Sequence, residues 1–398
     1  MAIKTAKEKL NGHDSAGKNN EVKVKKPEIP TVQIDEFDTV KIYNNEVIFD
    51  ENKPEENPPT SLQMYQGECF LMCPPFAADN AIANNSWMSD TDEPIDRYIY
   101  MEEWLRLYKD LSSIGMVYLS PTHPKLQDQV YISNGMWIPF HANKYCVMPN
   151  FKVEGRKENK DLGIPGENAV NEPFMKMLGY KTVHLPEEID GEPCYFEGSA
   201  DIKMINCEDP HGVVYVCGVG IRTSENAARW IENWLNEIDE DPNSHHKVIS
   251  YPQLDVDEYH MDCSIFVVDT THAILNTALV ETNEELKAAV EEISNYINVI
   301  PCNDIEILKA GLCNSLRAGN NIMMGSDINL LEGSEYVEDY AIEKRRIEFM
   351  QNVANKVGLN LSVYTLSEGL KGGAMLSCDV CDLRGWAFLK EYNTYFKY

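Results

Sequence analysis

From about Leu62 onward, short apolar segments alternate with amphipathic helical patterns almost to the end of the chain, and this alternation limits the possible folds most. The expected strands are Cys69–Cys73, Gly115–Ser120, Gln129–Ser133, Val213–Val219, Ser264–Asp269, Ile322–Met324 and Met375–Leu383. The expected helices are Tyr100–Ile114, Ser224–Ile238, Asn283–Ile297 and Glu338–Val357. Strands that alternate with helices in this way are typical of α/β folds. No literal repeat is visible, but the spacing allows a degenerate structural repeat of about 60–70 residues.

Two of the expected helices carry terminal signals. Thr282 and Glu285 have the spacing of a capping box at the start of the third helix. Gly358 follows the fourth helix, where glycine is the preferred residue just beyond a helix end.

Residues 1–60 differ from the rest of the chain. Met1–Lys26 is polar and rich in lysine, and Glu51–Pro59 is charged and rich in proline. Segments of this composition bury too little apolar surface to fold alone. We expect a disordered polar leader over 1–60 and one α/β domain over 61–398.

The charge balance excludes two classes of partner. The chain has 64 acidic and 35 basic residues, a formal net charge of -29. Such a surface repels nucleic acid and anionic membranes, so neither is expected as a partner. The charge agrees with simple solubility or with attraction of a small cationic substrate.

The cysteines indicate a reducing environment. There are 11, an odd number, scattered along the chain. Cys378 and Cys381 form the single CxxC pair, without a second pair or a nearby histidine, so no metal site and no cofactor are expected. No apolar run reaches the length of a membrane span, and no signal-peptide core is present at the start. We expect a cytoplasmic protein.

Five short segments bring polar and reactive residues to the expected strand ends. They are LQDQVYISNG (126–135), FEGSAD (196–201), VGIRTSENA (219–227), YHMDCSIF (259–266) and LKGGAMLSCDVCD (370–382). Each is weak evidence alone, because a lone aspartate or His-x-Asp is more often structural than catalytic. Their combination supplies several carboxylates, one histidine and one cysteine.

This combination suits attack on a guanidinium group. Carboxylates bind the edges of the planar cation, and its carbon can then be attacked by a thiolate. A nearby cation lowers the pKa of the thiol and so supplies the thiolate. A histidine held by a carboxylate can protonate the leaving amine and then activate water. The residues available for these tasks are Asp128, Glu197, Asp201, His260, Asp262 and Cys378.

In their order along the chain, the segments resemble the guanidino-group modifying (pentein) superfamily. This superfamily contains arginine deiminases, dimethylarginine dimethylaminohydrolases, arginine dihydrolases and glycine amidinotransferases. The resemblance runs from about Phe70 to Leu383. It implies a five-bladed, pseudo-symmetric α/β propeller in which 61–398 form the catalytic domain around a central site.

The resemblance assigns the substrate-binding residues. The segment FLMCPPFAADNAIANNSWM is similar to the opening segment of the bacterial hydrolases and places Asn85 at the substrate. LQDQVYISNG is similar to the segment that puts an aspartate, here Asp128, on the substrate guanidinium. GRKE (155–158) and IRTSENA (221–227) are similar to segments whose arginines hold the substrate carboxylate, here Arg156 and Arg222.

The resemblance also assigns the catalytic residues. YHMDCSIF gives His260 as the acid and base and Asp262 as a second ligand of the guanidinium. LSEGLKGGAMLSCDVCDL gives Cys378 as the nucleophile, with one extra residue before it. FEGSAD contains one inserted residue, so either Glu197 or Asp201 orients the histidine, and Glu197 is favoured.

Cys381 is an alternative nucleophile. On a strand, positions three apart point to opposite faces, so the two cysteines cannot both face one site. The glycine-rich approach favours Cys378.

The acceptor in the second half of the reaction stays open. Water would make the chain a hydrolase, and an amine such as glycine would make it an amidinotransferase. The opening NNSWM resembles the hydrolases, with Asn85 also allowing a dihydrolase, whereas the ending SCDVCDLRGW resembles the transferases. Hydrolysis is favoured.

A non-catalytic binding protein of the same fold is a third reading, since a fold does not imply a function. The expected partner is a small guanidino compound, and a homo-oligomer is allowed.

Overall fold

The computed structural model describes residues 42–43, 46–47, 68–91, 93–140, 142–206, 212–239, 241–326 and 337–383. The chain divides into two units, Met1–Glu56 and Asn57–Tyr398. In the first unit, β1 (Ile42–Tyr43) pairs antiparallel with β2 (Glu46–Val47). The remainder of the predicted leader, and its boundary near residue 60, lie outside the described residues.

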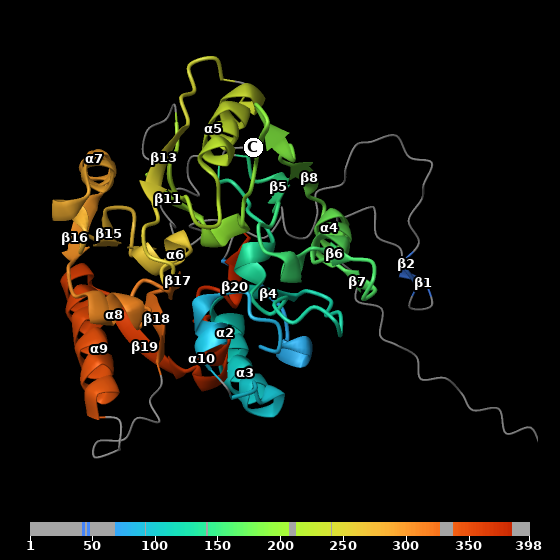
Figure 1. The fold of residues 1–398 in the computed structure, drawn as a ribbon, viewed down its shortest axis with the longest axis horizontal. Coiled ribbons are helices and arrows are strands. Elements are labelled where there is room, and N and C mark those ends of the chain that lie inside the picture. The colour runs from blue at the N-terminus through green and yellow to red at the C-terminus, as the bar shows by residue number, and fades with distance from the viewer. Residues whose placement is uncertain are drawn as a thin grey trace, which may run out of the picture. The chain divides into compact units, whose positions relative to one another are not determined.

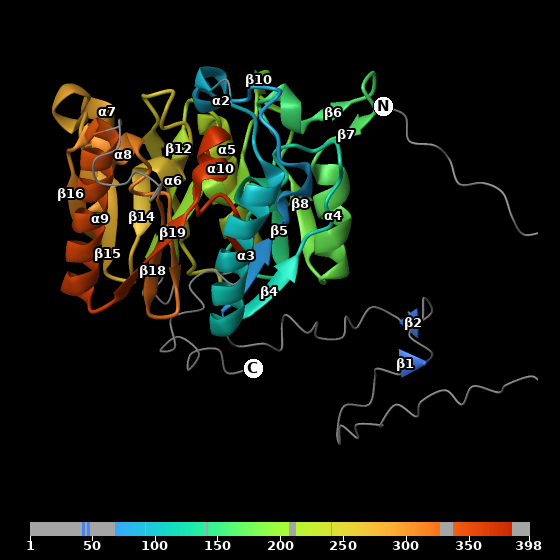
Figure 2. The ribbon, with the colours of Figure 1, turned by 90° about the horizontal axis from the view of Figure 1, so that it is seen from below.

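The described part of the second unit repeats one arrangement five times. A strand is followed by a long helix and then by a second strand, and the two strands pair in parallel (Figures 1 and 2). The five sets are β3 (Cys69–Met72), α3 (Arg97–Ile114) and β4 (Met116–Leu119); β5 (Tyr145–Met148), α4 (Asn168–Met177) and β8 (Lys181–His184); β12 (Val214–Val219), α5 (Glu225–Ile238) and β13 (Lys247–Pro252); β15 (His272–Asn276), α7 (Glu284–Ile293) and β16 (Asn298–Cys302); and β18 (Asn321–Ser326), α9 (Val337–Val357) and β19 (Asn360–Thr365). The structure is therefore a mixed α/β fold of small separate sheets.

Four of these sheets gain a third, antiparallel strand. They are completed by β11 (Ile202–Asn206), β14 (Ile265–Val267), β17 (Ser315–Ala318) and β20 (Val380–Asp382). In the fifth, an antiparallel bridge from Trp137 to Val147 takes the same place. Because β20 pairs with β3, the last strand that the structure describes completes the sheet of the first strand–helix–strand set.

The remaining elements are short. Two ribbons are formed by β6 (Glu158–Asn159) with β7 (Ile164–Pro165) and by β9 (Glu188–Ile189) with β10 (Glu192–Pro193). The short helices are α2 (Ser86–Asp90), α6 (Met261–Ser264), α8 (Ile305–Lys309) and α10 (Ser367–Lys371).

The long helices α3, α4, α5, α7 and α9 lie at the periphery of the second unit (Figure 1). The helix α5 shows the cause, since Ala227, Ala228, Ile231 and Leu235 are all buried and lie on one helical face. That face packs into one core cluster with residues of β12 and β13. All six residues of β12 are buried, as expected for a central strand covered on both faces.

Two predicted strands near the site need correction. Gln129–Ser133 is not a strand but a series of turns that leads into a 3-10 helix at Ile132–Gly135. Its amide groups bond locally or to distant carbonyls, as when Ser133 N donates to Cys378 O at 3.1 Å. Of the predicted strand Met375–Leu383, only Val380–Asp382 is a strand, and Cys378 lies in the turn before it.

One helix terminus also differs from the prediction. The N-cap of α7 is Asn283, whose side chain accepts a hydrogen bond from Leu286 N, so the predicted capping box at Thr282 is wrong. Asparagine is at least as strong an N-cap as threonine, which explains the shift by one residue. Gly358, with φ of +76°, follows the end of α9 as predicted.

Candidate active site

A small buried cavity of about 20 Å³ lies among the segments singled out by the sequence. Its lining includes six of the nine predicted site residues, namely Asn85, Asp128, Arg156, Arg222, His260 and Cys378. The three others, Glu197, Asp201 and Asp262, lie behind this lining and bond to it or to its chain neighbours. The structure thus brings all nine residues together.

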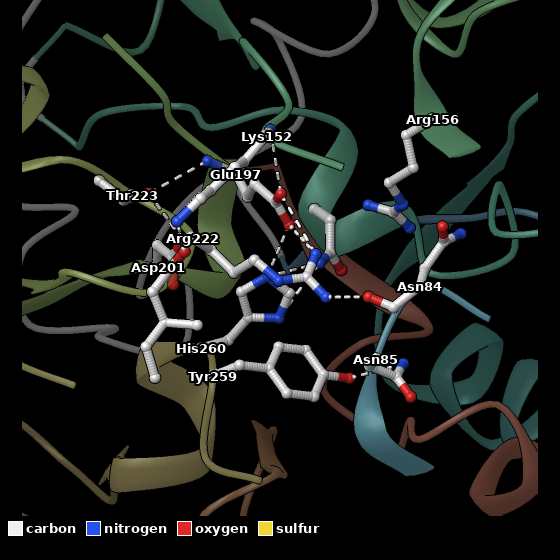
Figure 3. Close-up of polar contacts among 12 residues, drawn as sticks. Asn84, Asn85, Lys152, Arg156, Glu197, Asp201, Arg222, Thr223, Tyr259 and His260 are labelled. Carbon is white, nitrogen blue, oxygen red and sulfur yellow. Dashed lines mark hydrogen bonds and ion pairs between the residues drawn. The ribbon is translucent and has the colours of Figure 1, made fainter. Parts of the chain in front are cut away.

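His260 and Glu197 form a buried pair. His260 Nε2 lies 2.8 Å from Glu197 Oε2, and both side chains are almost fully buried (Figure 3). With Nε2 directed at the carboxylate, Nδ1 is the ring nitrogen left for proton transfer. Asn134 lies over the ring, with its Nδ2 at 3.3 Å from both ring nitrogens.

Asp201 has a different environment. Its carboxyl group accepts hydrogen bonds from Thr223 Oγ1 at 2.6 Å and from Met261 N at 3.2 Å. Burial raises the pKa of Asp201 to about 7. In contrast, the pKa of Glu197 is held below its usual range because Arg222 and His260 outweigh the effect of burial. Glu197 is thus the carboxylate that contacts His260, and Asp201 fixes the backbone that follows it.

Cys378 lies beside Asp262. Its Sγ is 3.7 Å from Asp262 Oδ2 and accepts a hydrogen bond of 3.2 Å from Asn314 Nδ2. Ser377 Oγ donates to the same Asp262 oxygen at 2.7 Å, and its backbone N donates to Asn314 Oδ1 at 2.9 Å. The thiol and its carboxylate neighbour are therefore held in one network that includes Asn314.

The environment of Cys378 favours the protonated thiol over the thiolate. Burial, followed by the negative charge of Asp262, raises its pKa well above the usual range. A positive charge brought next to both groups would reverse the second effect and offset the first. The site is thus arranged to form a thiolate when a cation enters.

The glycines before Cys378 are required by close contacts. A Cβ atom at Gly372 would lie 1.8 Å from Tyr131 Oη, so the buried side chain of Tyr131 would have to move. Gly373 has φ of +70°, a conformation that glycine adopts without strain.

Asp128 and Arg156 form a second buried cluster. Arg156 Nε lies 3.1 Å from Glu167 Oε1 and 3.7 Å from Asp128 Oδ2. Asn84 Nδ2 donates to the same Asp128 oxygen. Burial raises the pKa of Asp128, while Arg156 and Asn84 oppose this. The Nη1 atom of Arg156 is buried without a hydrogen-bond partner, so one donor of this cation is unused.

Arg222 occupies the cavity beside the histidine. Its Nη1 lies 3.0 Å from Glu197 Oε2, and its Nη2 donates to Asn84 O at 2.6 Å (Figure 3). Its guanidinium carbon is 4.7 Å from the ring centroid of Tyr259, a cation–π distance. A guanidinium group is therefore stable in this cavity, bound by a carboxylate and an aromatic face.

Asn85 anchors residues 84–88, which line one side of the cavity and are called the covering segment below. Its Oδ1 caps α2 by accepting from Met88 N, and its Nδ2 donates to Tyr259 Oη at 3.2 Å and Gly372 O at 3.0 Å. These bonds connect the covering segment to the histidine segment and to the glycines before Cys378.

The sequence alone did not single out Asn134, Asn314 or Tyr259 as site residues. Asn134 and Tyr259 stand inside segments already selected, so their position was the available signal. Asn314 stands in LCNSLR, which has no recognisable pattern, and only the fold brings it to Cys378. Among the described residues, no group of three His, Cys, Asp or Glu side chains could hold a metal ion.

Known structures share the fold. The N-terminal domain of ArgZ, an arginine dihydrolase of the cyanobacterial ornithine–ammonia cycle, matches with a TM-score of 0.60 and 17% identity, covering 80% of this chain and 97% of that one. Unliganded AgrE matches with a TM-score of 0.59 and 19% identity, over 79% of this chain and 39% of that one. A dimethylarginine dimethylaminohydrolase matches with a TM-score of 0.53 and 14% identity, over 79% and 99%. No protein-family model and no curated protein sequence matches.

The chain therefore shares its mixed α/β fold with these three structures, which agrees with the fold class expected from the sequence. At these identities the likeness establishes the fold alone.

Proposed function

We propose that this chain is a cysteine-dependent enzyme that acts hydrolytically on the guanidinium carbon of arginine or a methylated arginine. The observation that supports this best is the meeting of Cys378, Asp262 and the His260–Glu197 pair at one buried cavity. The fold is shared with an arginine dihydrolase and a dimethylarginine dimethylaminohydrolase, which agrees with this chemistry.

In the proposed complex, Asp128 and Asp262 bind the two edges of the substrate guanidinium. Both carboxylates are buried, so their attraction to a cation is only weakly screened. The bound cation lies next to Cys378 and lowers the pKa of its thiol, which burial and Asp262 otherwise raise. Substrate binding thus supplies the thiolate that attacks it.

The first half-reaction forms a carbon–sulfur bond and breaks a carbon–nitrogen bond. The Cys378 thiol passes its proton to His260 Nδ1, the thiolate adds to the guanidinium carbon, and His260 gives that proton to the departing amine. Glu197 stabilises the imidazolium before the transfer and holds the ring in place. The products are a neutral amine and a covalent thiouronium adduct.

The second half-reaction uses the imidazole left by the first. His260 takes a proton from water, and the resulting hydroxide adds to the adduct carbon. The carbon–sulfur bond then breaks as the new hydroxyl group becomes a carbonyl group. Its proton passes to the departing sulfur and His260 releases its own proton to solvent, which restores the resting thiol and imidazole. An amine acceptor in place of water would give an amidinotransferase. Hydrolysis is proposed because the NNSWM segment resembles the hydrolases.

Substrate entry requires the cavity to open. A volume of about 20 Å³ is enough for about one water molecule and not for an amino acid. Arg222 and the Asn84–Asn85 segment bond to each other across the cavity. We propose that both move when the substrate enters. Arg222 then leaves its ion pair with Glu197 and binds the carboxylate group of the substrate. The unused Nη1 donor of Arg156 fits a second contact with that carboxylate.

We also propose that the five strand–helix–strand sets form a closed five-bladed propeller around the cavity. Successive sets touch through β11 with β14 and β14 with β17, and α3 contacts β19. The pairing of β20 with β3 joins the end of the unit to its beginning. Residues 61–398 would then be one catalytic domain.

The small guanidino substrate is the partner we propose. A cytoplasmic location is proposed because so many thiols suit a reducing compartment. In the described part of the chain, no helix has the length and apolar character needed to cross a membrane.

Product analysis tests the proposed function. The full-length protein is incubated separately with arginine, with methylated arginines and with arginine plus glycine. We expect ammonia or a methylamine, with citrulline or ornithine as the other product. Guanidinoacetate from the third mixture would instead identify a transferase. Absence of turnover in all three would contradict the proposal and favour a non-catalytic binding protein.

Asn314 is predicted to be a positioning residue for the nucleophile. Its Nδ2 donates to Cys378 Sγ, and this bond lowers the pKa of the thiol. In Asn314→Ala we expect kcat to fall about 10- to 100-fold, the equivalent of one hydrogen bond to a charged group. The apparent pKa for alkylation of Cys378 by iodoacetamide should rise. A loss of kcat with an unchanged alkylation profile would show that Asn314 acts only through folding.

A further inference from the structure

A second cavity, of about 690 Å³, lies next to the catalytic one. It lies among the Asp257–Glu258 loop, α8, α9 and the turn after α10. Asn314 lines it and also donates to Cys378 Sγ, so a single side chain separates this cavity from the thiol. The mechanism above does not use it.

Glu258 is the unusual residue of this cavity. Its side chain is only 5% exposed, yet it lines the cavity wall. One carboxylate oxygen, Oε2, accepts a hydrogen bond from Asn276 Nδ2, whereas Oε1 is buried with no hydrogen-bond partner. A buried carboxylate oxygen without a donor is costly and is uncommon in folded proteins. Burial also raises the pKa of Glu258 to about 7.

The other charged groups in the wall already have partners. Lys309 bonds to Asp255 at 2.9 Å and to Asp257 at 3.0 Å, so it is engaged away from Glu258. Glu306 pairs with Arg345, and Glu343 pairs with Arg346. The acceptor without a partner at this wall is therefore Glu258 Oε1, which lies below the cavity surface, in a setting where acidic groups outnumber basic ones.

The rest of the wall is apolar. Trp87, Leu308, Ile342, Leu370 and Met375 contribute to it, and their side chains leave room for a hydrocarbon chain. A ligand that suits both features has a cationic nitrogen for Glu258 and a short aliphatic chain for these side chains.

We propose that this cavity is a binding site for a small aliphatic ammonium compound, whose nitrogen donates to Glu258 Oε1 once this carboxyl group turns toward the cavity. The site is separate from the guanidinium site and does not depend on the proposed function. The ligand would lie against the same loop that holds the covering segment, because Ser86 Oγ donates to Asp257 Oδ1 at 2.8 Å and Trp87 Nε1 donates to Asp257 O at 3.3 Å.

Calorimetric titration of the full-length protein with n-pentylamine at pH 8 tests the proposal, because Glu258 is mostly ionised there. Pentan-1-ol and pentanoate serve as neutral and anionic probes of the same length. We expect pentylamine to bind at least about tenfold more tightly than pentanol, as one charge-assisted hydrogen bond implies, and pentanoate to bind most weakly. Equal affinities for pentylamine and pentanol, or no binding of pentylamine, would overturn the proposal.

Variants locate the ligand. Glu258→Gln keeps the size of the side chain and should weaken pentylamine about tenfold or more, whereas Glu291→Gln, on the exposed face of α7, should leave it unchanged. Asp128→Asn should also leave pentylamine affinity unchanged, since Asp128 lines the other cavity. An affinity lost in Asp128→Asn but kept in Glu258→Gln would place the amine in the guanidinium site and refute the proposal. If Glu258→Gln does not fold, the comparison of pentylamine with pentanol on the unaltered protein still shows whether the site prefers a cationic nitrogen.

Discussion

Replacing Cys378 with alanine is expected to abolish turnover of the guanidino substrate, lowering kcat by at least about 10⁴-fold. The thiolate is the only group proposed to bond to the substrate carbon, and Asp262 beside it cannot take over that task. The removed sulfur atom is buried, so a modest loss of stability is also expected. The measurement is kcat from ammonia or amine release, together with a thermal unfolding curve.

Cys381→Ala is the matched control for this variant. Cys381 is also a buried cysteine, but it lies on β20, packs into a core cluster and has Ser199 Oγ at 3.8 Å from its sulfur. Its removal should cost a similar amount of stability and leave kcat within about threefold, because it does not line the catalytic cavity. Full activity in Cys378→Ala, or loss of activity in Cys381→Ala alone, would refute the assignment of the nucleophile.

Intact-mass analysis of the trapped adduct adds a second readout. If ammonia or a methylamine leaves first, the rest of the amino-acid substrate, with its α-amino and carboxylate groups, stays attached to Cys378. If the amine of an ornithine-like product leaves first, only the amidino group stays. The mass therefore shows which carbon–nitrogen bond is broken, independently of what attacks in the second half-reaction.

The alternation of strands and helices predicted the mixed α/β fold, but it could not predict all local structure. The α/β alternation and four long helices followed from periodicity, because helical faces such as that of α5 must bury their apolar residues. The predicted strand at Gln129–Ser133 failed because these residues are buried on every side and bond to partners distant in sequence. An alternation of apolar and polar residues cannot identify a strand when both faces of the segment are buried.

The candidate site could likewise be predicted only in part from the sequence. Six of its nine residues could be selected because a histidine, carboxylates and a cysteine suit one reaction, and the other three, Asn85, Arg156 and Arg222, were selected because their segments resemble those of a known superfamily. The contacts among these residues could not be predicted, because the sequence does not show that the Arg222 side chain bonds to Glu197. Asparagines such as Asn314 have no such signature, and only the tertiary fold gives them a function.

Replacing Glu197 with glutamine is expected to lower kcat by about 10²- to 10⁴-fold, an effect second only to that of replacing Cys378. Glutamine keeps the size of the side chain but removes the negative charge that faces His260 Nε2 at 2.8 Å. Without that charge, the imidazolium needed to protonate the leaving amine is less stable, and the ring can adopt the wrong orientation. Arg222 also loses its carboxylate partner, so the protein should be less stable by about 3 kcal/mol.

Asp201→Asn separates the two carboxylates that the sequence left as alternatives. Because the pKa of Asp201 is raised to about 7, the neutral acid is well populated near neutral pH and asparagine resembles it. Its partners, Thr223 Oγ1 and Met261 N, leave His260 untouched, so kcat should fall by less than about tenfold. Measured kcat and KM for both variants decide between them. A larger loss in Asp201→Asn than in Glu197→Gln, with both proteins folded, would mean that Asp201 orients the histidine during catalysis and that the pairing seen here is not the working one.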